Sequence, residues 1–128
     1  LRDLSKKTSQ KIVVTTGTIE TNLINKLKSS SNKLNDSLYE LELDDSKGYL
    51  FTNENFYSIS HLISKSSLFI SCHGAFTHIA SNYKIKILDI IEKSKIVHYG
   101  KITKDMKNYK SLYRDNFETL SKDIIKYS

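Results

Sequence analysis

The segment SCHGAFTHIASN, residues 71–82, contains the only cysteine of the chain and two of its four histidines. Three kinds of chemistry use such residues. A histidine base can activate a cysteine thiolate, thiolate and imidazole can bind a metal ion, and a glycine turn with a nearby imidazole can hold a phosphate. Which of them applies depends on where the fold places the segment.

The sequence around this segment alternates between strand and helix patterns. Short apolar runs predict strands at 12–14, 38–43, 67–71 and 85–91, and apolar residues at helical spacing predict helices at 18–28, 55–65 and 75–82. Thr18 is the expected cap of the first of these helices. The alternation predicts an α/β fold, a Rossmann-like three-layer sandwich with a mainly parallel sheet, as a single domain over residues 1–128.

The C-terminal third predicts two further helices. Residues 101–114, KITKDMKNYKSLYR, carry apolar residues on one helical face and basic residues on the other. A last helix follows, with Asp115 as its cap and Glu118 completing a capping box. The basic face is either a solvated surface or a contact with a membrane surface or another anionic partner. It consists of Lys101, Lys104, Lys107, Lys110 and Arg114.

Composition narrows the range of partners. The net charge of +6 favours anionic partners, although the basic residues are spread along the chain. The sequence has no helix-turn-helix or RNA-binding motif, so we do not expect a nucleic-acid partner. No apolar run approaches the roughly 20 residues that span a bilayer, nothing resembles a signal peptide, and a single cysteine fits a reducing compartment. We therefore expect a cytoplasmic protein.

The predicted fold places the 71–82 segment where the carboxyl end of a strand turns into a helix, the edge at which open α/β sheets bind ligands. The amides of Gly74, Ala75 and Phe76 would then face a diphosphate, and the His78 side chain would point back toward them. Adjacent Cys72 and His73 project in different directions, and a metal site lacks a fourth ligand, so we expect neither a catalytic cysteine nor a metal. The alternative is a purely structural role for the segment.

A family resemblance supports the phosphate interpretation. The run ISHLISKSSLFISCHGAFTHIASNYKIKILDII resembles the donor-binding half of GT-B glycosyltransferases, above all the heptosyltransferase-like members of glycosyltransferase family 9. That family has an Asp-Thr-Gly-x-x-His-x-Ala motif between a helix and a strand, and an earlier strand that ends in a glycine with an acidic residue three positions on, here Gly17 and Glu20. The resemblance covers about residues 4–92. This sequence departs from the motif, because Cys72 or His73 stands where the family has the acid.

The resemblance implies a nucleoside-diphosphate sugar as the ligand, with no cofactor, and the C-terminal portion of a two-domain enzyme of lipopolysaccharide or surface polysaccharide synthesis at the inner face of the membrane. The N-terminal acceptor-binding domain would be a missing partner, so this chain would not transfer sugar unaided. The alternative is a non-catalytic Rossmann-like nucleotide-binding or interaction domain. The implied ligand contacts are Thr16, Gly17, Thr18, Glu20, Cys72, His73, Gly74, Ala75, Phe76, Thr77 and His78.

Overall fold

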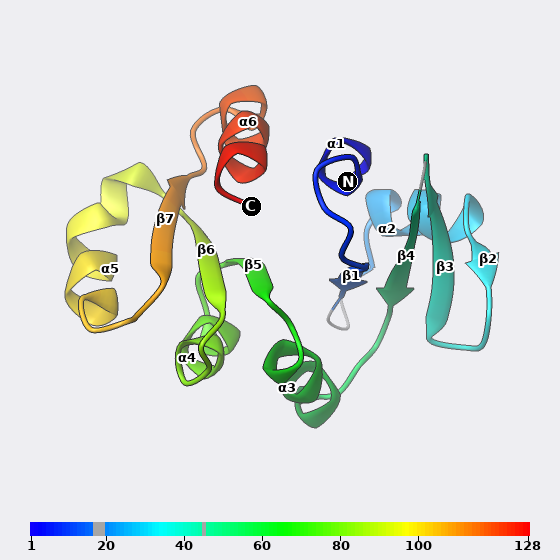
Figure 1. The fold of residues 1–128 in the computed structure, drawn as a ribbon, viewed down its shortest axis with the longest axis horizontal. Helices are drawn as coiled ribbons and strands as arrows, with labels where there is room; N and C mark the ends of the chain where they lie inside the picture. The colour runs from blue at the N-terminus through cyan, green and yellow to red at the C-terminus, as the bar shows by residue number, and fades with distance from the viewer. Residues whose placement is uncertain (17–19, 45) are drawn as a thin grey trace. The chain divides into compact units, whose positions relative to one another are not determined.

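The computed structural model describes residues 1–16, 20–44 and 46–128 of the chain. They form an α/β fold, as predicted, with two sheets (Figure 1). The chain divides into two compact units, Leu1–Ile59 and Ser60–Ser128. The single domain expected over residues 1–128 stays a prediction. Gly17 and Thr18, two of the expected ligand contacts, lie outside the described residues.

The first unit has a mixed sheet. Its strand order is β1-β4-β3-β2, in which β4 pairs parallel with β1 and antiparallel with β3. The predicted strands at 12–14 and 38–43 are confirmed as β1 and β3, whereas β4 was not predicted. The helix α3, Phe56–Ser64, spans the boundary between the units. The other elements are α1 (Arg2–Ser5), β1 (Ile12–Thr15), α2 (Asn22–Ser29), β2 (Asn32–Lys33), β3 (Leu38–Leu43) and β4 (Ser46–Phe51).

The core of the first unit leaves no room at Gly48, which lies in β4 between β1 and β3. Leu41, Leu43 and Leu50 form this core, and their burial stabilises the sheet. A Cβ atom at Gly48 would lie 2.8 Å from Cδ1 of Leu43 and 3.1 Å from the carbonyl oxygen of Ile12. A side chain at this position would therefore have to displace the end of the buried Leu43 and press against the backbone at Ile12.

The second unit has an all-parallel sheet in the order β5-β6-β7, with α4 connecting the first two strands and α5 the last two. In Figure 1, α5 and α6 lie on opposite sides of β7. Ile87, Leu88 and Leu112 are fully buried on this sheet, which agrees with a Rossmann-like sandwich. Its elements are β5 (Leu68–Cys72), α4 (Ala75–Ser81), β6 (Lys86–Ile91), a 3₁₀ turn (Lys93–Lys95), α5 (Ile96–Thr103), β7 (Tyr109–Tyr113) and α6 (Phe117–Tyr127).

The helix predicted over 101–114 is wrong beyond Thr103. The helix α5 ends there, Asn108 adopts a left-handed conformation with φ 55°, and residues 109–113 form β7 instead. The free edge of β6 accounts for the difference, because pairing of β7 with β6 satisfies the backbone groups of both strands. The last two helices are thus α5 and α6, with a strand between them. The hypothesis of membrane contact stays a prediction for the basic residues, but they do not share one helix.

Two helix caps differ from those expected. The helix α2 begins after Thr21, whose hydroxyl oxygen accepts a hydrogen bond from the amide of Ile24 at 3.2 Å. The helix α6 is capped by Asn116 rather than Asp115, because the Asn116 side-chain oxygen accepts from the amides of Glu118 and Thr119. Among the helices that the structure describes, none has the length and apolar character needed to cross a membrane.

We predict opposite effects for alanine at two glycines. Gly48→Ala lowers the free energy of unfolding by about 1–3 kcal/mol, because the new methyl group must displace Leu43 or the backbone at Ile12. Gly100→Ala, inside α5 where a Cβ meets nothing within 4 Å, leaves stability unchanged or raises it by up to about 1 kcal/mol. Urea unfolding followed by circular dichroism measures both. A Gly48→Ala protein as stable as the wild type would contradict the packing argument.

Candidate functional site

The turn after β5 lies at the carboxyl end of the parallel sheet, as predicted. The strand ends at Cys72, and Gly74 is the N-cap residue of α4. The Gly74 backbone is extended, with φ 178° and ψ −169°, a conformation open to any residue. A Cβ atom there would meet only the carbonyl oxygen of Cys72, at 3.9 Å. The fold itself therefore does not require glycine at this position, and the space beside its Cα is open within the described residues.

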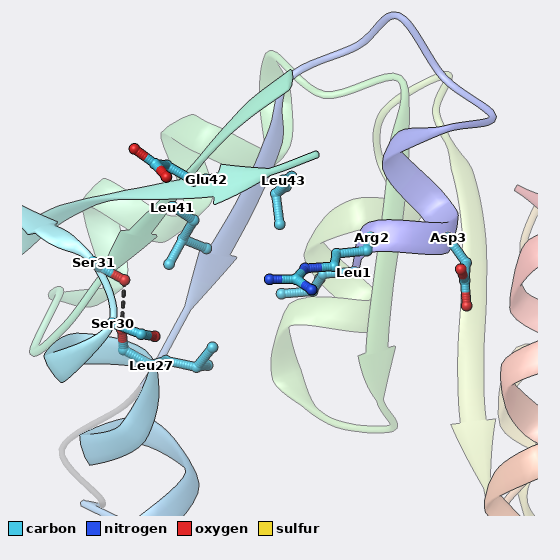
Figure 2. A pocket seen from close by; sticks show the side chains of 9 residues that line it. All are labelled: Leu1, Arg2, Asp3, Leu27, Ser30, Ser31, Leu41, Glu42 and Leu43. Carbon is cyan, nitrogen blue, oxygen red and sulfur yellow. Dashed lines mark hydrogen bonds between the residues drawn. The ribbon is translucent and has the colours of Figure 1, made fainter. Parts of the chain in front are cut away.

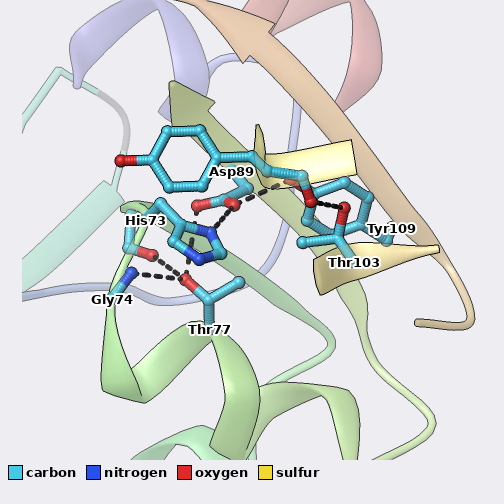
Figure 3. A network of polar contacts seen from close by, with 8 residues as sticks. His73, Gly74, Thr77, Asp89, Thr103 and Tyr109 are labelled. Carbon is cyan, nitrogen blue, oxygen red and sulfur yellow. Dashed lines mark hydrogen bonds and ion pairs between the residues drawn. The ribbon is translucent and has the colours of Figure 1, made fainter. Parts of the chain in front are cut away.

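A buried carboxylate is the centre of the site (Figure 3). Asp89 lies in β6 with no exposed surface. Its Oδ2 atom lies 2.5 Å from Nδ1 of His73 and accepts a hydrogen bond from the Tyr109 hydroxyl at 2.8 Å, while Oδ1 accepts from the Thr77 hydroxyl at 3.3 Å. A carboxylate buried without partners costs several kcal/mol. Three donors, from the β5–α4 turn, α4 and β7, offset that cost.

The strand register explains how these groups meet. Asp89 is paired with Ser71 in β5 and with Ser111 in β7, so two small side chains flank it on the sheet. Tyr109 lies two residues before Ser111 and therefore projects from the same face of the sheet as Asp89. The small neighbours leave room for the Tyr109 ring and the His73 imidazole to reach the carboxylate.

Thr77 connects the carboxylate to the turn. Its single hydroxyl proton is donated to Asp89, so the oxygen accepts from the amide of Gly74 at 3.3 Å and from the hydroxyl of Ser71, also at 3.3 Å. The Thr77 amide in turn donates to the Gly74 carbonyl oxygen at 3.0 Å. Thr77 is completely buried. Its hydroxyl therefore stabilises the turn from the buried side. The amide of Gly74, which was expected to face a diphosphate, donates its hydrogen bond to Thr77 instead.

Two imidazoles lie side by side at the turn. The His73 side chain is 10% exposed, and its ring centroid lies 4.4 Å from that of Tyr99 in α5 and 5.3 Å from that of His78. His78 is exposed. A residue one turn into a helix directs its side chain back toward the helix start, and the contact with His73 agrees with that direction. The site therefore presents one nearly buried and one exposed imidazole.

Tyr109 serves the site as a fixed donor. The pKa of its phenol lies well above the usual value of 10, mainly because the group is buried and also because it donates a hydrogen bond to Asp89. A hydrogen bond with Thr103 has a smaller effect and lowers this pKa (Figure 3). At neutral pH the phenol keeps its proton and donates it to the carboxylate.

The predicted ligand contacts in the second unit, Cys72 to His78, all lie in this turn and in the first turns of α4. Cys72 is an exposed free thiol, and Ala75 is also exposed. Thr16 and Glu20 belong to the first unit. A hydrogen bond from Lys28, at 2.8 Å, lowers the pKa of Glu20. That Thr16 and Glu20 contact the same ligand as the turn stays a prediction.

Sequence reasoning missed Asp89 and Tyr109, and the sequence held a signal for the first of them. Asp89 interrupts the apolar run ILDII, at a place where neighbouring residues are buried. An aspartate is almost never fully buried unless it is paired. A buried acidic residue inside a strand therefore predicts partners, although it does not say which ones.

A hollow lies within each unit. In the first unit a pocket of about 480 Å³ lies beside α1, the end of α2 and β3, with Leu27 and Leu41 among the apolar residues that line it and Arg2 and Glu42 among the charged ones (Figure 2). In the second unit a groove of about 600 Å³, with His78, Lys84 and Lys107 in its lining, lies mainly at the C-terminal end of α4 and the amino end of β7, the edge of the sheet opposite the turn. Across the described ranges, no three or more His, Cys, Asp or Glu side chains are grouped as a metal ion requires.

Comparisons of the chain with models of protein families, with curated proteins and with solved structures found no match. The expectations that came from the resemblance to GT-B glycosyltransferases therefore stay predictions.

The raised pKa of Tyr109 predicts a loss of stability at high pH. The unfolded chain releases this phenol proton near pH 10, while the folded protein retains it to higher pH. The contribution of the phenol to the free energy of unfolding is therefore complete below about pH 10 and falls as the pH rises further. Tyr109→Phe costs about 1.5–3 kcal/mol at neutral pH, the usual contribution of a hydrogen bond to a charged group. The difference in free energy of unfolding between wild type and variant narrows above pH 10, as urea unfolding at several pH values measures. A constant difference from pH 7 to 11 would contradict the assignment.

Proposed function

We propose that the second unit binds a nucleoside-diphosphate sugar by its diphosphate at the turn between β5 and α4, as the donor-binding part of a glycosyltransferase. The observation that carries the proposal is the pair of imidazoles, His73 and His78, with ring centroids 5.3 Å apart beside Gly74. They lie at the carboxyl end of a parallel strand, where ligands bind in open α/β sheets. Protonated imidazoles donate strong hydrogen bonds to phosphate oxygens.

Two further features support an anionic ligand at this place. His78 is exposed, so its ring is accessible. The open space beside Gly74 lets a phosphate approach the backbone closely.

In the proposed reaction an acceptor hydroxyl attacks the anomeric carbon, and the bond from that carbon to the diphosphate oxygen breaks with its electron pair going to the diphosphate. Imidazolium groups at the turn stabilise the charge that develops on the departing diphosphate. The acceptor site and the base that takes the hydroxyl proton would come from the N-terminal domain that the resemblance implies. The setting would be surface polysaccharide synthesis on the cytoplasmic side of a membrane.

One observation favours the alternative of a non-catalytic nucleotide-binding domain. Neither alignment of residues 72–78 with the family motif places an acidic residue at its first position. Such a domain would bind the diphosphate equally well but would not support sugar transfer when joined to an acceptor domain.

We predict that His78→Ala weakens binding of a nucleoside diphosphate about tenfold to a hundredfold, the equivalent of roughly 1.5–3 kcal/mol for a hydrogen bond to a charged group. Binding of the same nucleoside without phosphates changes little. Isothermal titration calorimetry with the common ribonucleoside diphosphates, with inorganic pyrophosphate and with the nucleosides measures all three. His61→Ala, which removes an exposed histidine from α3, is the matched control and leaves every affinity unchanged.

The outcomes separate the possibilities. Equal losses for the diphosphate and the nucleoside would indicate damage to the fold rather than loss of a phosphate contact. Wild-type affinity in His78→Ala would make His78 a structural residue. No binding of any diphosphate or of pyrophosphate to the wild-type chain would overturn the proposed site.

A further inference from the structure

We infer that Asp89 is the positioning residue of the phosphate site: it fixes His73 with Nδ1 as a proton donor, so that Nε2 is the atom that meets a phosphate oxygen. The inference rests on the proposed function for the identity of the ligand. Asp89 itself is fully buried and acts only through His73.

The geometry makes Nδ1 of His73 the hydrogen-bond donor to the Asp89 carboxylate. An ionised carboxylate is an acceptor only, so at 2.5 Å from Oδ2 the Nδ1 atom must carry the proton. The other two contacts of the carboxylate are also with donors, the hydroxyls of Tyr109 and Thr77. They hold both oxygens in place, so the carboxylate does not rotate away from His73.

The second nitrogen of His73 is left for a ligand. Within the part of the chain that the structure describes, Nδ1 has the only hydrogen bond of this ring, and no buried side-chain nitrogen or oxygen lacks a partner. Nε2 therefore reaches the surface although the side chain is only 10% exposed. The rings of Tyr99 and His78 pack against the imidazole and keep its orientation. Nε2 thus has a fixed direction at a small opening.

The arrangement suits an anion better than a neutral group. An imidazolium with a carboxylate at Nδ1 and a phosphate oxygen at Nε2 has both of its donors satisfied by charged acceptors. The ring and Asp89 together are then a neutral buried pair, so the fold does not bury an uncompensated charge. When a phosphate binds, Nε2 is already aligned with it and takes up the proton that it then donates, so the ring loses little entropy on binding.

Asp89→Asn tests the inference, because the amide offers one acceptor oxygen to three donors. The amide N–H₂ group then faces Nδ1 of His73, which becomes an acceptor, and the ring proton moves to Nε2, as is known for this substitution in histidine–aspartate pairs. A neutral ring makes a hydrogen bond about half as strong as a charged one. We expect inorganic pyrophosphate to bind Asp89→Asn about tenfold more weakly than wild type.

Two readouts and a matched control make the test decisive. Two-bond nitrogen–proton NMR correlations report the tautomer of the neutral His73 ring without any ligand, and calorimetry reports pyrophosphate affinity. We expect the Nδ1–H tautomer in wild type and the Nε2–H tautomer in Asp89→Asn. Tyr113→Phe, the matched control, removes a phenol hydroxyl from the same strand, β7, but none of the hydrogen bonds to Asp89. It should keep the wild-type tautomer and bind pyrophosphate within about twofold of wild type.

An Nε2–H tautomer in the wild-type chain would overturn the inference, whether or not Asp89→Asn folds. Equal pyrophosphate affinities of wild type and Asp89→Asn would also overturn it while leaving the proposed phosphate site intact. Failure of the wild-type chain to bind pyrophosphate would instead overturn the proposed function, and with it the role of Nε2 as a phosphate contact.

Discussion

Burial of the Asp89 carboxylate is the constraint on which the second unit depends. With no surface exposed to water, the carboxylate requires hydrogen bonds from the protein. Its donors are separated from it by 12, 16 and 20 residues in sequence, in α4, the β5–α4 turn and β7. One side chain of the middle strand therefore joins β7, the turn after β5 and the helix between β5 and β6. Loss of any donor leaves charge less well compensated in the interior.

The same network determines what the turn can do. The Thr77 hydroxyl accepts a hydrogen bond from the Gly74 amide and donates one to Asp89, so it links the backbone of the turn to the carboxylate. His73 is oriented by Asp89 and by its ring contacts, whereas His78 remains exposed beside it. A site in which one imidazole is fixed and its neighbour is accessible loses little freedom when an anion binds. This is the physical basis of the proposed diphosphate site.

Local patterns in the sequence predicted the parts of the fold that local patterns control. The apolar runs that form β1, β3, β5 and β6 and the helical spacing of α4 are confirmed. β7 was mistaken for a helix because Met106, Tyr109 and Tyr113 also fit helical spacing. The segment forms a strand because it pairs with β6, a contact that local spacing does not reveal. Asp89 was visible as an acid inside ILDII, but its partners are too distant in sequence for a local pattern to identify.

A double-mutant cycle between Asp89 and His73 tests most directly whether this pair organises the site. The free energies of unfolding of wild type, Asp89→Ala, His73→Ala and the double variant give the coupling between the two side chains, because neither alanine can replace the removed hydrogen bond. If Asp89 and His73 hold each other as the 2.5 Å contact indicates, the coupling is about 1–3 kcal/mol in favour of the wild-type pair. A coupling near zero, with the two single substitutions simply additive, would contradict the account.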